Sequence, residues 1–207
     1  QFLANQFNNN GSVEQKDVLP TPLRLAFISG HVSAGIALYH AGELKMAASH
    51  LMHPVSETPA DERIGLNDIG FNLEIFESVS AALETQESAA ILLPLLEEAE
   101  KHLDRMRDKA DGDPIKIIRF LLETSVEEYS VGVRDGKLTD VGEYQDAFGF
   151  VLVAAEHARR LPKTSRERLV AEILSLQDYW LRGPLPVETP TSAEDLALTV
   201  NLILSQL

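Results

Sequence analysis

Apolar residues recur every three to four positions along most of the chain, the spacing that gathers them on one face of a helix. This pattern predicts helices over eight stretches: 23–39, 44–53, 69–83, 91–106, 114–133, 141–160, 165–182 and 192–206. No stretch reads as a convincing strand. Because the intervening loops are short, neighbouring helices should run antiparallel. The sequence therefore predicts an all-α fold, a bundle of about eight helices arranged as antiparallel helical hairpins.

Capping residues mark where several of these helices should begin. Thr21 precedes Pro22, and Asp113 precedes Pro114, so each pair predicts a cap followed by proline at the first helical position. Three further starts have the pattern of a capping box, in which glutamate follows the cap residue three positions later. They are Asp140 with Glu143, Thr164 with Glu167, and Thr191 with Glu194. Pro54 is expected to end the second helix.

The chain divides into a short polar start and a long helical remainder. Residues 1–20 include an asparagine-rich stretch without helical periodicity, so they are predicted to form a flexible N-terminal segment. Residues 21–207 are expected to form a single all-α domain, with a possible sub-boundary near residues 111–113. The start at Gln1 fits an exported protein whose signal has been removed, and equally a chain trimmed at a domain boundary.

The composition is that of a folded, acidic protein. Of 207 residues, 44% are hydrophobic and 24% are charged, close to ordinary globular usage. The formal charge of −14 argues against nucleic acid or an anionic membrane as a partner, because such surfaces are bound by lysine and arginine. The absence of cysteine excludes disulfides, cysteine-ligated metal sites and thiol catalysis. The longest apolar runs fall far short of the roughly 20 residues that span a bilayer, so no membrane span is predicted.

Four of the six histidines lie within one short window, at positions 31, 40, 50 and 53. His31 and His40 are nine residues apart on one predicted helix, so they face opposite sides of it. His50 and His53 are three residues apart and share a face of the next helix. In an antiparallel hairpin turning at Gly42, His31 and His50 lie at similar heights. The pattern therefore predicts that His31, His50 and His53 converge.

Converging imidazoles in an acidic chain indicate a possible transition-metal site, because neutral imidazole is a common metal ligand. The candidate ligands are His31, His50 and His53, completed by Glu57 or by a carboxylate from another helix. Mixed histidine and carboxylate ligands allow Fe, Zn, Cu, Ni or Mn. The alternative is that His31 is a packing residue among small neighbours, and that His50 and His53 lie at a helix end that favours positive charge.

A second cluster combines carboxyl and phenol groups at the end of one predicted helix and the start of the next. Its members are Glu123, Glu127, Glu128, Tyr129, Glu143, Tyr144 and Asp146. Glu123 and Glu127 are four residues apart and share a face, which suits a hard cation with oxygen ligands. Glu128 and Glu143 are the best carboxylate candidates for a metal. The alternative is solvated charge that caps helix ends.

The motifs of common enzyme classes are missing. The chain contains no Glu-x-x-His pair, no His-Glu-x-x-His, no Gly-x-Gly-x-x-Gly and no phosphate-binding loop. The stretch 30–35 is not a nucleophile elbow, because its first glycine lies three residues before Ser33 and no strand precedes it. The chain is therefore predicted not to be an enzyme, although catalysis by Glu and Tyr stays open.

Part of the chain resembles a known family. The carrying motifs are Glu128-Tyr129, Asp135-Gly136-Lys137, Glu143-Tyr144, Phe148 to Val151 and Leu161-Pro162. Over roughly residues 113–182 they resemble the extracytoplasmic N-terminal region of bacterial Ftr-type iron permeases. The membrane helices and the Arg-Glu-x-x-Glu iron motif of those permeases are absent from this sequence. The resemblance therefore implies an exported helical accessory or sensing module connected with iron or another transition metal, rather than a transporter.

Two functions follow as expectations. The first is an exported, periplasmic, non-enzymatic helical protein that binds a transition metal ion, iron above all, with a membrane permease or another protein as partner. The second is a helical interaction module, because residues 35–59 look like one tetratricopeptide-type hairpin, with Gly35, Ala47 and Leu51 at plausible repeat positions. Its acidic surface would suit a basic protein partner.

Overall fold

The computed structural model describes residues 19–56 and 64–207, and over these residues the predicted all-α bundle is confirmed. Its α-helices are α1 Thr21–His40, α2 Leu44–Ser56, α3 Ile64–Asp68, α4 Leu73–Glu84, α5 Ala89–Ala110, α6 Pro114–Gly132, α7 Val141–Arg159, α8 Lys163–Ser175 and α9 Ala193–Leu204. Shorter elements are β1 Val133–Arg134, β2 Lys137–Leu138, the 3-10 helix η2 Leu176–Tyr179 and β3 Leu181–Pro184. Residues 1–18 of the predicted flexible segment lie outside the described part of the chain.

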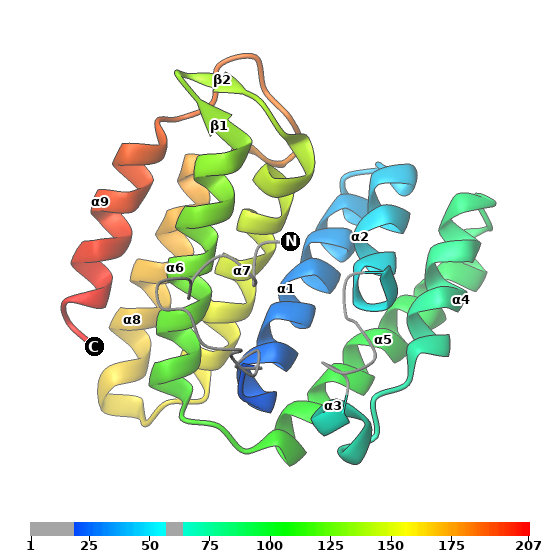
Figure 1. Ribbon diagram of the computed structural model, residues 1–207. Coiled ribbons are helices and arrows are strands. Elements are labelled where there is room, and N and C mark those ends of the chain that lie inside the picture. Colours follow the sequence, from blue (N-terminus) through cyan, green and yellow to red (C-terminus); the bar gives the residue numbers. More distant parts are fainter. Residues whose placement is uncertain (1–18, 57–63) are drawn as a thin grey trace, which may run out of the picture.

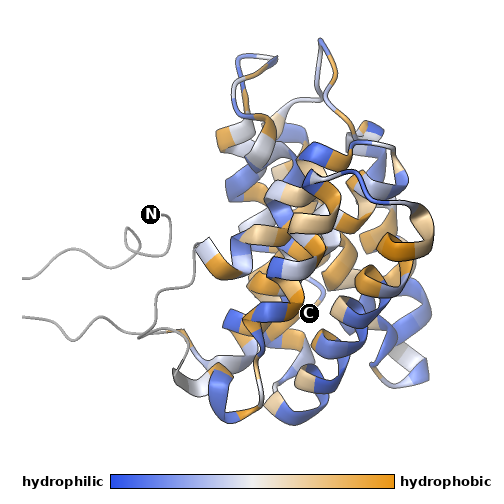
Figure 2. Ribbon diagram, turned by 90° about the vertical axis from the view of Figure 1, so that its right-hand side faces the viewer, coloured by the Kyte–Doolittle hydropathy of each residue, from blue (hydrophilic) through white to orange (hydrophobic). Residues whose placement is uncertain are grey.

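Helix α1 lies at the centre of the molecule (Figure 1). On one side of it lie α2, α4 and α5, and on the other side α6 to α9. Two hydrophobic clusters correspond to these groups, and α1 contributes Ala26 to the second and Leu25, Ile28, Val32 and Leu38 to the first. Apolar positions turn toward the interior of the bundle in Figure 2, as amphipathic helices require. Among the described helices, none has both the length and the apolar character needed to cross a membrane.

Helices α1 and α7 approach so closely that their backbones touch. A Cβ added at Gly149 of α7 would lie 2.1 Å from the carbonyl oxygen of Gly30 of α1. A Cβ added at Gly30 would lie 2.1 Å from the ring of Phe150. Only glycine, which has no side chain, fits at either position. This contact fixes the register of the two helices. As a result His31, which follows Gly30, faces the turn of α7 that precedes Gly149.

Two predicted helix starts are confirmed by the hydrogen bonds of their caps. The Asp113 carboxylate accepts from the backbone N–H groups of Ile115 and Lys116 at the start of α6. The Asp140 carboxylate accepts from those of Gly142 and Glu143 at the start of α7. Each aspartate satisfies N–H groups that have no partner within the helix itself.

Other predicted helix ends are wrong by one or a few residues. The cap of α9 is Ser192, whose hydroxyl accepts from the N–H of Asp195, and not Thr191. Helix α8 begins directly after Pro162 without a side-chain cap, so Thr164 lies within its first turn. Thr21 likewise lies inside α1. Helix α2 continues through the buried Pro54 to Ser56. Because Pro54 lies near the end of the helix, only the last turn loses a hydrogen bond.

A small hairpin that the sequence did not predict joins α6 to α7. In it Val133 pairs with Leu138 and Arg134 with Lys137, in antiparallel orientation. The turn between them is Asp135-Gly136, and both residues have positive φ, +50° and +68°. Asp-Gly is favoured in such two-residue hairpin turns. The strands are only two residues long, too short for an alternating pattern to be visible in the sequence.

Candidate metal centre

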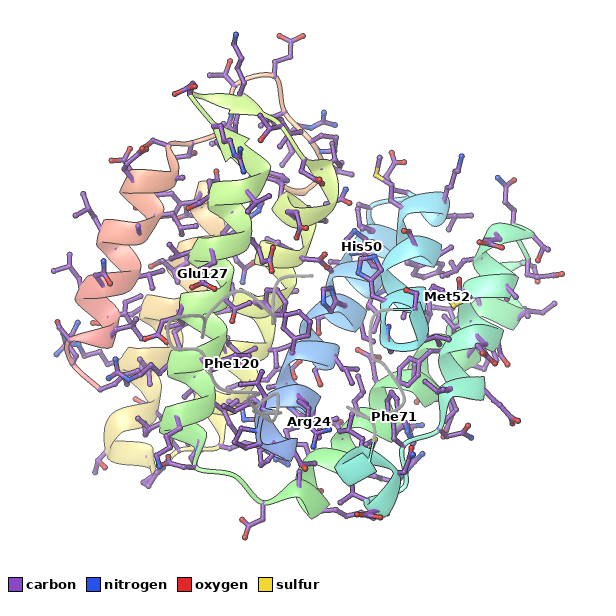
Figure 3. All side chains as sticks on the ribbon, in the orientation of Figure 1. Arg24, His50, Met52, Phe71, Phe120 and Glu127 are labelled. Atoms are coloured by element: carbon purple, nitrogen blue, oxygen red, sulfur yellow. The ribbon has the colours of Figure 1, made fainter. Side chains whose placement is uncertain are left out.

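Three helices bring three histidines and one aspartate together in the interior. Helix α1 supplies His31, α2 supplies His50 and His53, and α7 supplies Asp146. One ligand atom from each of the four lies within 4.8 Å of all the others. His50 projects from α2 into the space between α2 and α1 (Figure 3). The predicted histidine triad therefore converges, and a carboxylate from another helix completes the group.

The spacing of these atoms is of the same order as the edges of a coordination shell. Nδ1 of His31 and Nδ1 of His50 lie 2.7 and 2.8 Å from Oδ1 of Asp146. Nδ1 of His53 lies 3.1 Å from Nδ1 of His31 and 3.7 Å from Oδ2 of Asp146. Ligand atoms bonded at about 2.0–2.1 Å to a tetrahedral ion are about 3.3 Å apart. To hold a small ion, the two pairs in hydrogen-bond contact with Oδ1 of Asp146 would therefore have to move apart by about 0.5–0.6 Å.

Local packing explains why the four residues meet. His31 follows Gly30, and Asp146 lies one helical turn before Gly149 and Phe150, the residues through which α1 and α7 touch. On the other side, a Cβ at Gly35 of α1 would lie 2.9 Å from the side chain of Leu51. Glycines thus bring α7 and α2 against α1, and the polar groups at the crossing are buried.

The charge state of the cluster suits cation binding. Burial alone would raise the pKa of Asp146, but the charge of His31 and hydrogen bonds from His31 and His50 outweigh it, so this pKa lies below its usual value. Burial, together with the neighbouring His31, lowers the pKa of His53 to about 4. At neutral pH, Asp146 is therefore an ionised carboxylate and His53 a neutral imidazole. These are the forms that bind metal ions.

Aromatic rings hold His31 in place. Its ring centroid lies 4.6 Å from that of Phe27 and 5.4 Å from that of Phe150. Its Nε2 is buried and has no hydrogen-bond partner among the described residues. The ring therefore uses Nδ1, the nitrogen that faces the cluster, for its polar contacts.

The other predicted carboxylates are placed elsewhere. Glu57 lies outside the described residues. Glu128 of α6 is 2% exposed and lies close enough to Glu143 of α7 for that residue to raise its pKa, so the structure brings these two together. They are not members of the four-residue group around Asp146. Their part in metal binding remains a prediction.

Residues 112–207 match the family model of the iron permease-associated 4-helix bundle domain. The resemblance to iron permeases is confirmed. The match covers α6, α7, α8 and α9, which we call the permease-associated bundle. It includes Asp146 but none of the three histidines of the cluster. Neither the search of curated proteins nor that of solved structures found a match.

Inside the permease-associated bundle, the Glu128–Glu143 pair should make stability depend on pH. Burial, followed by the hydrogen bond and charge of Glu143, raises the pKa of Glu128 above its usual value near 4.5. The unfolded chain releases this proton as pH rises through 4.5, whereas the folded chain keeps it up to the raised pKa. Folding is therefore destabilised progressively as pH rises, by at most about 1.4 kcal/mol per pH unit.

The variant Glu128→Gln should remove this dependence, because its amide carries no titrating proton. We expect its stability relative to wild type to increase from pH 5 to pH 8 in urea unfolding. Glu123→Gln is the matched control, since Glu123 is exposed on the same helix and should show no such trend. A difference between Glu128→Gln and wild type that stays constant with pH would mean that Glu128 is ionised in the folded protein.

The sequence does not mark Asp146 as a ligand of the histidine cluster. It places Asp146 in the carboxyl and phenol cluster, where Glu128 and Glu143 are the best metal candidates. One signal was present, because Gln145 and Asp146 interrupt a helix whose following residues, 147–155, are all apolar or small. Polar residues at core positions are rare and need partners.

Proposed function

We propose that the protein binds one divalent transition metal ion through His31, His50, His53 and Asp146, and that it serves iron handling as an accessory protein. The observation that carries this proposal is the convergence of three Nδ1 atoms and one ionised carboxylate in the protein interior. The three imidazoles and the carboxylate supply the donors that a cation requires, and their ligand atoms lie within 4.8 Å of one another.

The chemistry of the donors favours a divalent ion of intermediate softness. Three neutral imidazoles and one carboxylate carry one negative charge, which a divalent ion more than neutralises. Imidazole suits Fe, Zn, Cu and Ni, whereas a hard ion such as Ca²⁺ prefers six or more oxygen ligands. Iron is the proposed cargo because the permease-associated bundle matches an iron permease-associated family.

The same features support a non-enzymatic role. Four protein ligands complete a tetrahedral shell, whereas catalytic zinc sites use three protein ligands and keep one position for water or substrate. We therefore propose a module that holds or delivers iron outside the cytoplasm, working with a membrane permease. The acidic charge of −14 supports this role, because it raises the concentration of cations near the surface.

The tetratricopeptide-like alternative is less well supported by the packing. In the hairpin of α1 and α2, the backbone of Gly35 packs directly on Leu51 and on the carbonyl of Ala47. The other side of α2 packs against α4, where the hydroxyl of Ser80 donates to the carbonyl of Ala48. A filled hairpin core of this kind leaves no groove at these positions for a partner peptide.

Metal titration tests the proposal. The protein, purified without chelator or affinity tag, is titrated at pH 7 with Zn²⁺, Mn²⁺ and, without oxygen, Fe²⁺. We expect one ion per chain and a rise in melting temperature. His50→Ala should lose both effects, whereas His40→Ala should keep them, since His40 is exposed at the end of α1. If no ion binds, or if His50→Ala binds as tightly as wild type, the proposal fails.

A further inference from the structure

A buried glutamine connects the metal centre to a methionine. Oε1 of Gln145 lies 2.9 Å from Nε2 of His50, the ring nitrogen that faces away from Asp146. Nε2 of Gln145 lies 3.1 Å from Sδ of Met46 on α2. Gln145 is 2% exposed, so water does not compete for these contacts. The glutamine therefore has one fixed partner for each end of its amide.

Met46 determines which way the amide points. A thioether sulfur has no hydrogen to donate and is a weak acceptor, so the NH₂ group must face it. The carbonyl oxygen then faces Nε2 of His50. A carbonyl only accepts hydrogen bonds, so Nε2 of His50 must carry a proton.

We propose that Gln145, oriented by Met46, is a positioning residue that keeps the proton of His50 on Nε2 and so reserves Nδ1 for the metal ion. This inference rests on the proposed function. It deepens that function, because it names the residue that sets the ligand atom and the tautomer of one ligand.

The arrangement makes Nδ1 of His50 a cation-requiring position. This atom lies 2.8 Å from Oδ1 of Asp146. A neutral imidazole with its single proton on Nε2 would point its Nδ1 lone pair at an ionised carboxylate, which is repulsive. The hydrogen bond that Asp146 accepts from His50 therefore means that Nδ1 also carries a proton in the metal-free protein. When the ion binds, it takes the place of this proton, which is released, and the proton on Nε2 does not move.

Without Gln145, the neutral ring of His50 would prefer the other tautomer. The neutral ring would place its single proton on Nδ1, where Asp146 accepts it, and leave Nε2 unprotonated. Binding through Nδ1 would then require moving that proton to a buried nitrogen without an acceptor. Hydrogen-bond partners of metal-binding histidines typically account for about 10–100-fold in affinity.

Two variants of Gln145 separate this role from packing. Gln145→Leu removes the acceptor, whereas Gln145→Glu keeps an acceptor for the N–H of His50. The readouts are the ¹⁵N chemical shifts of the His50 ring in the metal-free protein at pH 8, and the affinity for Zn²⁺. We expect a proton on Nε2 of His50 in wild type and Gln145→Glu, and no proton on Nε2 in Gln145→Leu. Zn²⁺ affinity should fall about 10–100-fold in Gln145→Leu only.

Met46 provides a second test. Met46→Leu should reduce Zn²⁺ affinity several-fold, because the amide loses the contact that orients it. Met52→Leu, on the same helix (Figure 3), is the control and should bind as wild type does. The inference is overturned if Gln145→Leu keeps the proton on Nε2, or if it binds Zn²⁺ as tightly as wild type. If wild type binds no metal ion, the proposed function fails, and the ¹⁵N shifts still decide whether Gln145 sets the tautomer.

Discussion

Exchanging Asp146 for asparagine is expected to weaken Zn²⁺ binding by about 100-fold or more and to destabilise the metal-free protein by about 3–5 kcal/mol. Oδ1 of Asp146 faces Nδ1 of both His31 and His50, at 2.7 and 2.8 Å. Asparagine supplies no negative charge and has only one acceptor oxygen. Buried polar groups of the two histidines would be left without an ionised partner, which is costly in the protein interior.

Urea unfolding and Zn²⁺ titration of the Asp146→Asn variant measure the two effects. Asp135→Asn is the control, because Asp135 is exposed and asparagine is equally favoured before glycine in a hairpin turn. The control should stay within about 0.5 kcal/mol of wild type. Because the pKa of Asp146 is lowered in the folded state, its stabilisation is present above its usual value of 3.8 and is lost as pH falls below it. Unchanged Zn²⁺ affinity in Asp146→Asn would remove Asp146 from the site.

Gly149→Ala is expected to have the second largest effect, a loss of about 3 kcal/mol of stability together with weaker Zn²⁺ binding. The new Cβ would lie 2.1 Å from the carbonyl oxygen of Gly30 and 2.8 Å from the backbone nitrogen of Ala34. Both are backbone atoms and cannot rotate away, so α1 and α7 must separate. His31 and Asp146 lie on these two helices, and their distance would increase with the separation.

Gly142→Ala is the matched control on the same helix. Its new Cβ would meet only Oδ1 of Asp140, at 3.3 Å, in the half-buried first turn of α7. Alanine is a better helix former than glycine by about 1 kcal/mol, so this variant should be neutral or slightly stabilised. Equal midpoints of urea unfolding for Gly149→Ala and Gly142→Ala would contradict direct backbone contact between α1 and α7 at Gly149.

The histidine triad could be predicted because its geometry is mostly local. His50 and His53 share a helix face at a spacing of three residues, and a single tight turn at Gly42 sets His31 beside His50. Such relations depend only on helix periodicity and on one short connection. The helix starts at Asp113 and Asp140 could be predicted for the same reason, since each cap acts within three residues.

Asp146 could not be predicted because its position depends on packing between distant segments. His31 and Asp146 are separated by 115 positions in the chain. They meet only because two glycines let α1 and α7 touch, and a sequence does not show which glycines face one another. The predicted helix start at Thr164 is wrong for a different, local reason. Helix α8 begins directly after Pro162, so Thr164 already lies within its first turn.

The proposed metal centre lies between the two halves of the molecule. Three candidate ligands come from α1 and α2, which lie before the permease-associated bundle, and the fourth comes from α7 within it. An ion bound by all four residues binds only the assembled arrangement. It should therefore stabilise the contact between α1 and α7, by an amount that rises with the logarithm of the ratio of ion concentration to Kd.

Anomalous X-ray diffraction at the zinc absorption edge, from crystals of the protein loaded with Zn²⁺, tests the central claim most directly. We expect one strong peak per chain, about 2.0–2.2 Å from Nδ1 of His31, His50 and His53 and from a carboxylate oxygen of Asp146. A peak between Glu128 and Glu143 instead, or no peak while Asp146 keeps its hydrogen bonds to the histidines, would contradict it.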